Sequence, residues 1–111
     1  MNGKIDPSVR FRGMLGFAMR AGKVIIGTEQ VFAALPRKGR VKLVLLCTDA
    51  SDETKKRVRV KCEFYSTPAI EIGMDMQSLG ALIGKTYAPA CVALTDDGFA
   101  TEIKKLYMSE C

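Results

Sequence analysis

Four short runs of apolar residues alternate along the chain with segments whose apolar residues recur at helical spacing. Such alternation places helices on both faces of a mostly parallel or mixed sheet. The predicted fold is therefore α/β, a three-layer α-β-α sandwich around a mixed, mostly four-stranded sheet. The predicted strands cover residues 23–26, 41–47, 69–72 and 90–95, and the predicted helices cover 8–21, 28–35, a charged segment from 51, 75–83 and 99–107.

The ends of these segments carry residue types that begin and end helices. Gly22 stops the first predicted helix, and Thr28 is the expected N-cap of the second, which ends at residues 36–39. Ser51 begins the third, and the Asp-Asp-Gly sequence at 96–98 is expected to form a turn before the last. The third helix is expected to bury three side chains: Val58, Cys62 and Phe64.

Length and composition indicate one folded unit without a metal or a cofactor. The 111 residues are about the length of one domain, so we expect a single domain over residues 1–111, folded throughout except at 1–7. The chain has four cysteines, no Cys-x-x-Cys pair and no histidine, which argues against a metal site and fits a reducing cytoplasm. Its apolar runs are far shorter than the roughly 18 residues of a membrane span.

Signals for catalysis are weak, and we predict neither an enzyme nor any catalytic residue. Without histidine, Ser-His and Cys-His nucleophiles are excluded. The sequence Gly-Ala-Leu-Ile-Gly-Lys-Thr at 80–86 has a three-residue spacer where a phosphate loop needs four, so we interpret it as a helix ended by Gly84 and followed by an exposed lysine. Asp49 and Asp96 follow apolar strands, where working carboxylates occur, but helix caps or turn residues are the commoner role.

Positive charge is concentrated in the first part of the chain. Residues 1–42 hold nine Lys and Arg against two acids, a net charge of +7, whereas residues 43–111 carry −2. Such a basic region favours a polyanionic partner, but charge alone does not distinguish RNA, DNA and anionic lipid. The glycine turn and helix start at residues 20–30 favour structured RNA among these. A second basic run in the third predicted helix is either a solvated face or a second RNA contact: Lys55, Lys56, Arg57, Arg59 and Lys61.

Two surface elements are the predicted RNA-binding sites, and both lie at strand–helix junctions that are expected to share an end of the sheet. In the first, glycines let a ligand approach the backbone, polar side chains follow, and cations lie nearby. In the second, a tyrosine either stacks on an unpaired base or packs against the body. The first element comprises Arg20, Gly22, Lys23, Gly27, Thr28, Glu29 and Gln30, with Arg37, Lys38 and Arg40 adding charge; the second comprises Lys85, Thr86, Tyr87, Ala88 and Pro89.

Together these motifs resemble the ribosomal-protein family that binds kink-turns, the L7Ae and L30e type, and most nearly its bacterial YlxQ-like branch. The resemblance runs from about residue 11 to 107, and the combination of Arg-Ala-Gly-Lys at 20–23 with Gly-Thr at 27–28 is fairly specific. The matching segments are 15–23, 27–28, 42–46, 49–51, 79–80, 84 and 90–93.

The resemblance implies an α-β-α sandwich that grips a sharply bent RNA internal loop with tandem sheared G·A pairs. By this resemblance the residues from Gly27 to Gln30 would lie at the G·A pairs, Lys23 would hold phosphate, and the segment 85–89 would cover a flipped-out nucleotide. We predict a cytoplasmic, non-enzymatic monomer that binds ribosomal RNA or a structured mRNA leader, with the ribosome as a further candidate partner in translation.

The chain departs from the family at three places. Archaeal members follow Gly-Thr with Asn-Glu where this chain has Glu29 and Gln30, they place lysine where it has Ala33, and their strand often ends Lys-Lys where it has Ile25 and Ile26. Each lost cation removes a contact worth about 1–3 kcal/mol. Two alternatives therefore stay open: an RNA- or ribosome-associated protein whose target is not a kink-turn, and a protein-interaction module on the same fold.

Overall fold

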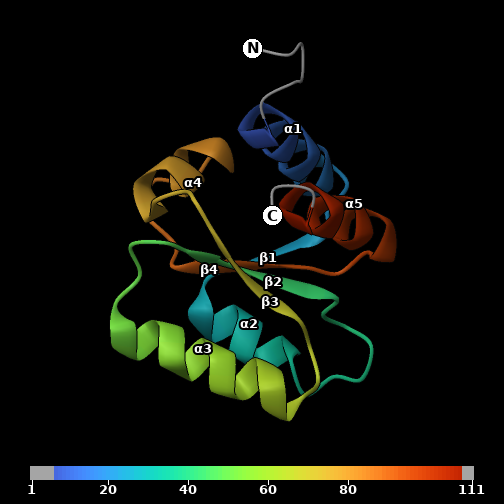
Figure 1. Ribbon diagram of the computed structural model, residues 1–111, viewed down its shortest axis with the longest axis vertical. Helices are drawn as coiled ribbons and strands as arrows, with labels where there is room; N and C mark the ends of the chain where they lie inside the picture. The colour runs from blue at the N-terminus through green and yellow to red at the C-terminus, as the bar shows by residue number, and fades with distance from the viewer. Residues whose placement is uncertain (1–6, 109–111) are drawn as a thin grey trace.

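The computed structural model describes the backbone of residues 7–108 and the side chains of residues 9–106. Helices and strands alternate through this part of the chain as the apolar patterns predict (Figure 1). The elements are α1 (Pro7–Arg20), β1 (Val24–Ile26), α2 (Thr28–Ala34), β2 (Leu43–Cys47), α3 (Asp52–Phe64), β3 (Ala69–Ile72), α4 (Met76–Leu82), β4 (Cys91–Leu94) and α5 (Asp97–Met108).

The four strands form one mixed sheet in the order β1-β4-β2-β3. β4, the last strand in sequence, lies between β1 and β2 and pairs antiparallel with both. β3 pairs parallel with β2 at the edge. Every residue of β2 and of β4 is buried, which is expected of central strands covered on both faces.

Two hydrophobic clusters, one on each face of the sheet, hold the layers together. Alternate strand residues point to opposite faces, so Leu45 and Val92 join the cluster under α1, α4 and α5, whereas Val44 and Ala93 join the cluster under α2 and α3. Figure 1 shows these two helical layers above and below the sheet. The predicted three-layer α-β-α sandwich with a mixed four-stranded sheet is therefore confirmed.

Several local predictions differ from the structure. Phe64 was expected to be buried, but it lies on the outer surface at the end of α3 and is 77% exposed. The expected turn at 96–98 is instead the start of α5, because the Asp96 carboxylate accepts a hydrogen bond from the Phe99 amide at 3.1 Å and so begins the helix. α1 begins at Pro7, within the segment expected to be unfolded, and residues 1–6 lie outside the described part.

The described cysteines are small core residues with free thiols. Cys47, Cys62 and Cys91 are almost fully buried. Burial raises the pKa of Cys47 to about 12 and that of Cys62 to about 11, and it also raises the pKa of Cys91. No helix among residues 7–108 is long and apolar enough to cross a membrane.

These thiols should be unreactive in the folded protein, because the thiolate is the reactive form. We expect a Cys111→Ser variant to react negligibly with a thiol reagent near pH 8 and to show three reactive thiols once unfolded. Absorbance of the released chromophore measures both states. Rapid labelling of the folded variant would contradict the burial of these residues.

Candidate nucleic-acid interface

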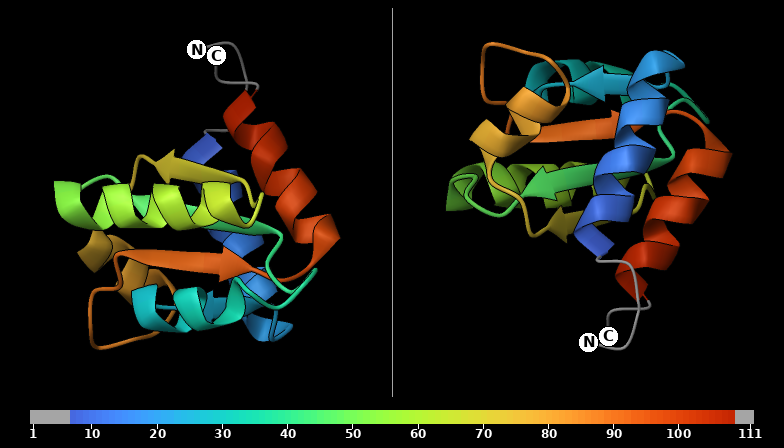
Figure 2. Two further views of the ribbon diagram at one scale, coloured as in Figure 1. Left: turned by 90° about the horizontal axis from the view of Figure 1, so that it is seen from below. Right: turned by 90° about the horizontal axis from the view of Figure 1, so that it is seen from above.

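Four chain segments meet at one end of the sheet, which we call the Gly27 end. β1, β2 and β3 finish there and β4 starts there, so the loops that follow or precede them are neighbours (Figure 2). The Gly27 amide donates to the Cys91 carbonyl at 3.0 Å, and the Cys47 amide donates to the Ala90 carbonyl at 2.9 Å. The start of α2 and the loop at 85–89 therefore adjoin, as predicted from their positions at strand–helix junctions.

The start of α2 is built on a glycine. Gly27 occupies the N-cap position with φ 97° and ψ 149°, a backbone conformation that side chains rarely adopt. The prediction of Thr28 as N-cap is wrong because Thr28 is already helical, and its hydroxyl lies 3.8 Å from the Cys91 thiol. Glu29 and Gln30 follow on the exposed side of the first turn.

The loop at 85–89 is fixed at both ends and exposed between them. Gly84, at φ 76°, ends α4, and the Lys85 amide donates to the Gly80 carbonyl at 2.8 Å. Pro89 is buried, and its carbonyl accepts a hydrogen bond from the Cys47 thiol at 3.6 Å. Residues 85–88 are exposed, as predicted for a helix ended by Gly84 and followed by an exposed lysine.

The backbone of Tyr87 packs against α4, while its side chain stays partly exposed. Its carbonyl packs directly over Gly80, where an added Cβ would overlap the Tyr87 oxygen and lie 3.4 Å from the Pro89 Cδ. Its side chain nevertheless remains 54% exposed. With Asp49, Gln77 and Lys85, it lines an open pocket of about 520 Å³ between α4 and the loop. Neither Gly80 nor Gln77 was predicted to belong to this region, because their proximity depends on tertiary packing.

The other predicted RNA-binding residues lie away from the Gly27 end. Lys23 precedes β1 and its carbonyl accepts a hydrogen bond from the Thr95 amide at 3.0 Å, which places it at the opposite end of the sheet. The three-residue strand separates it from Gly27 by about 13 Å of extended chain. Arg20 and Gly22 lie near Lys23, and the Arg20 guanidinium stacks 4.9 Å from the Phe17 ring. The expectation that Arg20 and Lys23 lie beside Gly27 is therefore wrong.

A groove along α2 extends from the polar start of the helix toward the basic turn that follows it. Arg37 and Lys38 lie in this turn and are exposed. Gln30, Ala33, Arg37 and Arg40 contribute to the lining of a shallow groove of about 230 Å³. Apart from Arg20, Gly22 and Lys23 at the opposite end of the sheet, the predicted residues thus form an end surface and a basic flank that meet near Gln30.

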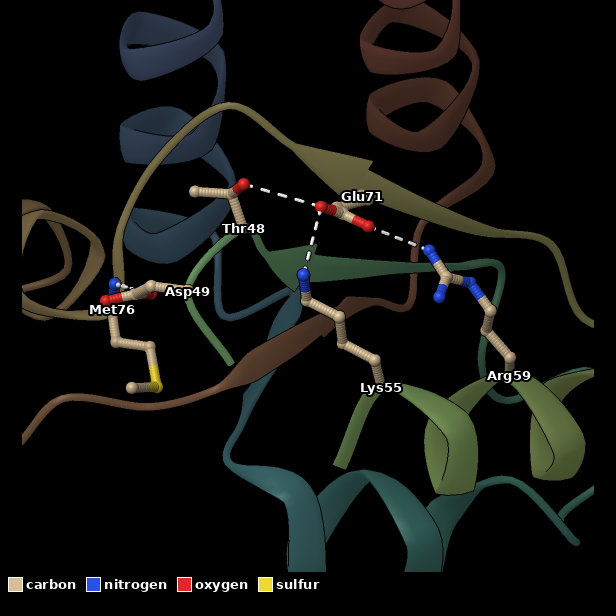
Figure 3. A network of polar contacts seen from close by, with 6 residues as sticks. All are labelled: Thr48, Asp49, Lys55, Arg59, Glu71 and Met76. Atoms are coloured by element: carbon tan, nitrogen blue, oxygen red, sulfur yellow. Dashed lines mark hydrogen bonds and ion pairs between the residues drawn. The ribbon is translucent and has the colours of Figure 1, made fainter. Parts of the chain in front are cut away.

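Asp49 and Asp96, the two aspartates predicted to follow strands, both cap helices, Asp96 at the start of α5. The Asp49 carboxylate accepts a hydrogen bond from the Met76 amide at 2.8 Å, and so caps α4 from across the fold (Figure 3). Asp75 caps the same helix through the Ser78 amide at 2.7 Å, and hydrogen bonding to Ser78 lowers the pKa of Asp75. Among the described residues, no group of three or more Cys, Asp or Glu side chains could hold a metal ion.

The basic run of α3 divides between two faces of the helix. The Arg59 guanidinium pairs with the Glu71 carboxylate at 2.8 Å and the Lys55 ammonium pairs with it at 3.2 Å (Figure 3). Hydrogen bonds from Arg59 and Lys55 lower the pKa of Glu71. Arg57 and Lys61 instead lie over the ring of Phe32 in α2, each 5.2 Å from its centroid.

Replacing Gly80 with alanine tests whether the loop depends on a close approach to α4. We expect Gly80→Ala to lower the free energy of unfolding by about 1–2 kcal/mol, because overlap with the Tyr87 carbonyl outweighs the gain in helix propensity. Gly13→Ala in α1, where an added Cβ meets nothing within 4 Å, should instead stabilise by about 0.5–1 kcal/mol. Urea unfolding measures both, and equal effects would argue against the close approach.

The Glu71 ion pairs predict a pH-dependent stability. Since the folded-state pKa of Glu71 lies below its ordinary value of 4.5, the contribution is present above pH 4.5 and is lost as the pH falls through the lower folded-state pKa. We expect Glu71→Gln to melt at a lower temperature than wild type near pH 7, and the difference to close as the pH falls through the lowered folded-state pKa of Glu71. A constant difference across this range would contradict an ionic origin.

Comparisons with known proteins identify relatives of this chain. The chain is 43% identical over 93 residues to the RNA-binding protein YlxQ of Bacillus subtilis, covering 84% of this chain and 90% of that protein. It is 28% identical over 104 residues to the large ribosomal subunit protein eL30 of Sulfolobus acidocaldarius, covering 88% and 99%. These relatives bear the names of RNA-binding and ribosomal proteins, in a family not known for enzymes, in agreement with the prediction that the chain is not an enzyme.

Solved structures share the fold of this chain. A protein with unknown function from Bacillus halodurans superimposes with a TM-score of 0.78 at 36% identity, covering 86% of this chain and 94% of that one. The 15.5kD RNA binding protein of Giardia lamblia shares the fold, with a TM-score of 0.73 at 15% identity. Residues 10–104 match the family described as Ribosomal protein L7Ae/L30e/S12e/Gadd45 family, and the chain belongs to this family, in its YlxQ-like branch.

Proposed function

We propose that this protein is a non-enzymatic, cytoplasmic RNA-binding protein that recognises a kinked internal loop with sheared G·A pairs in translation-associated RNA. The observation that carries the proposal is the junction of the start of α2 with the loop at 85–89 at the Gly27 end. The names of the relatives, RNA-binding protein YlxQ and large ribosomal subunit protein eL30, support RNA as the partner.

The side chains at this end suit an irregular RNA rather than a regular duplex. RNA is read mainly where bases are unstacked and their edges are accessible. Gln30 is exposed and offers both a donor and an acceptor to a base edge, and Glu29 beside it accepts hydrogen bonds. The half-exposed Tyr87 provides a ring on which an extruded base stacks.

The loop at 85–89 also supplies charge at this end. Lys85 is exposed, and no carboxylate among the described residues forms an ion pair with it. An unneutralised lysine beside polar base-reading groups attracts phosphate. Lys23, Arg20 and the turn at 37–40 lie farther away, so in this proposal they contact RNA outside the kinked loop.

The proposal is tested by titrating the protein with a kink-turn RNA at two salt concentrations. The control RNA has its tandem G·A pairs converted to Watson–Crick pairs. We expect binding at least tenfold tighter to the kink-turn, because regular pairing hides the base edges. Equal and strongly salt-dependent binding to both would refute kink-turn recognition and support an RNA-associated protein with a different target.

Two substitutions separate base reading from phosphate attraction. Gln30→Ala should weaken binding to the kink-turn by about tenfold and barely affect the control RNA, because it removes hydrogen bonds to base edges. Lys85→Ala should weaken binding to both RNAs and reduce the salt slope by about 1. Lys104→Ala, on α5 across the sheet, removes the same charge as Lys85→Ala and should have little effect. Equal losses on both RNAs for Gln30→Ala would exclude a reading role.

A further inference from the structure

The cationic side chains of α3 have different interaction partners. Lys55 and Arg59 face β3, where both pair with the Glu71 carboxylate, so much of their charge is neutralised within the fold (Figure 3). Arg57 and Lys61 lie one helical turn apart on the side toward α2. Two of the five cations of this helix are thus neutralised by Glu71, and two others lie over Phe32 without a carboxylate partner.

Arg57 and Lys61 are exposed and unneutralised. Among the described residues, no carboxylate forms an ion pair with either, and Glu53, one turn before Arg57, does not pair with it. Their contact is the half-buried Phe32 ring, 5.2 Å from each cationic group. A cation–π contact restrains a cationic side chain without cancelling its charge.

These two cations continue the surface that begins at Gln30. α2 and α3 lie side by side on the same face of the sheet, and both begin at the Gly27 end (Figure 2). On one flank of α2, Gln30 shares its groove with Arg37 and Arg40. On the other flank, Arg57 and Lys61 of α3 lie over the Phe32 ring. Cations therefore flank α2 on both sides.

We propose that Arg57 and Lys61 bind backbone phosphates of the RNA helix that flanks the kinked loop, with Phe32 holding the two side chains in position. This inference rests on the proposed function, which places the loop itself at the start of α2. Contacts to phosphate position a protein on RNA and carry no sequence information. The pair therefore contributes affinity and orientation but does not discriminate between loop sequences.

The test compares a kink-turn RNA that has a long flanking stem with one whose stem is cut short. The variant is Arg57→Gln with Lys61→Gln. The control is Lys104→Gln with Lys105→Gln, which removes the same formal charge from α5 on the other face of the sheet, although Lys105 is paired with Glu102 at 3.7 Å. Affinities are measured over a series of salt concentrations. Thermal unfolding verifies that each variant is folded.

On the long-stem RNA, we expect the Arg57/Lys61 variant to lose about tenfold in affinity at low salt and about 2 in the salt slope, while the α5 control changes little. The loss should be much smaller on the short-stem RNA. Exchanging the residues, Arg57→Lys with Lys61→Arg, keeps both charges and should largely restore binding.

The outcomes separate this inference from the proposed function. If wild type binds the kink-turn specifically but the Arg57/Lys61 variant behaves like the α5 control, the phosphate contact is overturned and the proposed function stands. If the variant loses the same amount on both stems, the cations do not contact the flanking helix. If wild type binds neither RNA, both proposals fail.

Discussion

The position of β4 between β1 and β2 is the constraint on which the candidate surface depends. β4 is the last strand in sequence, yet it is buried on both faces and pairs antiparallel with both neighbours. Its first residues therefore lie beside the end of β1, and the Cys91 carbonyl accepts a hydrogen bond from the Gly27 amide. This pairing brings the start of α2 next to a loop some 60 residues later in the chain. Without it, neither segment would form a shared surface.

The sequence predicts the layers of the fold well because burial periodicity is a local signal. The all-apolar run of β2 indicates a strand covered on both faces, and Ser51 is recognisable as a cap, which its hydrogen bond with the Thr54 amide confirms. Phe64 shows the limit of that reasoning. It is apolar, but it comes only two positions after the buried Cys62 and therefore lies on roughly the opposite side of α3, outside the core.

The candidate site is predicted less completely, because it depends on contacts between distant segments. The sequence identifies the two surface elements, but it cannot show that one strand separates Lys23 from Gly27 or that Asp49 caps a helix 27 positions away. It also misidentifies the cap of α2. Gly27, and not Thr28, takes the position, since its positive φ favours a residue without a side chain. Such facts follow from topology and backbone geometry, which composition and spacing do not contain.

Counting charged residues also fails to show which cations are neutralised, because that depends on tertiary packing. The cations of α3 look equivalent in sequence. Glu71 nevertheless forms ion pairs with Lys55 and Arg59, whereas Arg57 and Lys61 lie over the Phe32 ring. An aromatic ring and a carboxylate both hold a cation in place, but only the carboxylate removes it from the field that a polyanion experiences. The electrostatic surface of this protein is therefore set by which cations lack a carboxylate, and net charge alone does not reveal it.

The loop at 85–89 illustrates how a small fold prepares a surface without enclosing it. Pro89 is buried, and its carbonyl accepts a hydrogen bond from the Cys47 thiol. The Tyr87 carbonyl packs against Gly80, so the backbone of the loop is fixed at several points. The exposed side chains between these points are consequently presented on an ordered backbone. Ordering a loop on binding costs free energy, and a loop ordered by the core reduces that cost. The close packing at Gly80 therefore contributes to any affinity of Tyr87 for a partner, although Gly80 itself has no side chain with which to bind one.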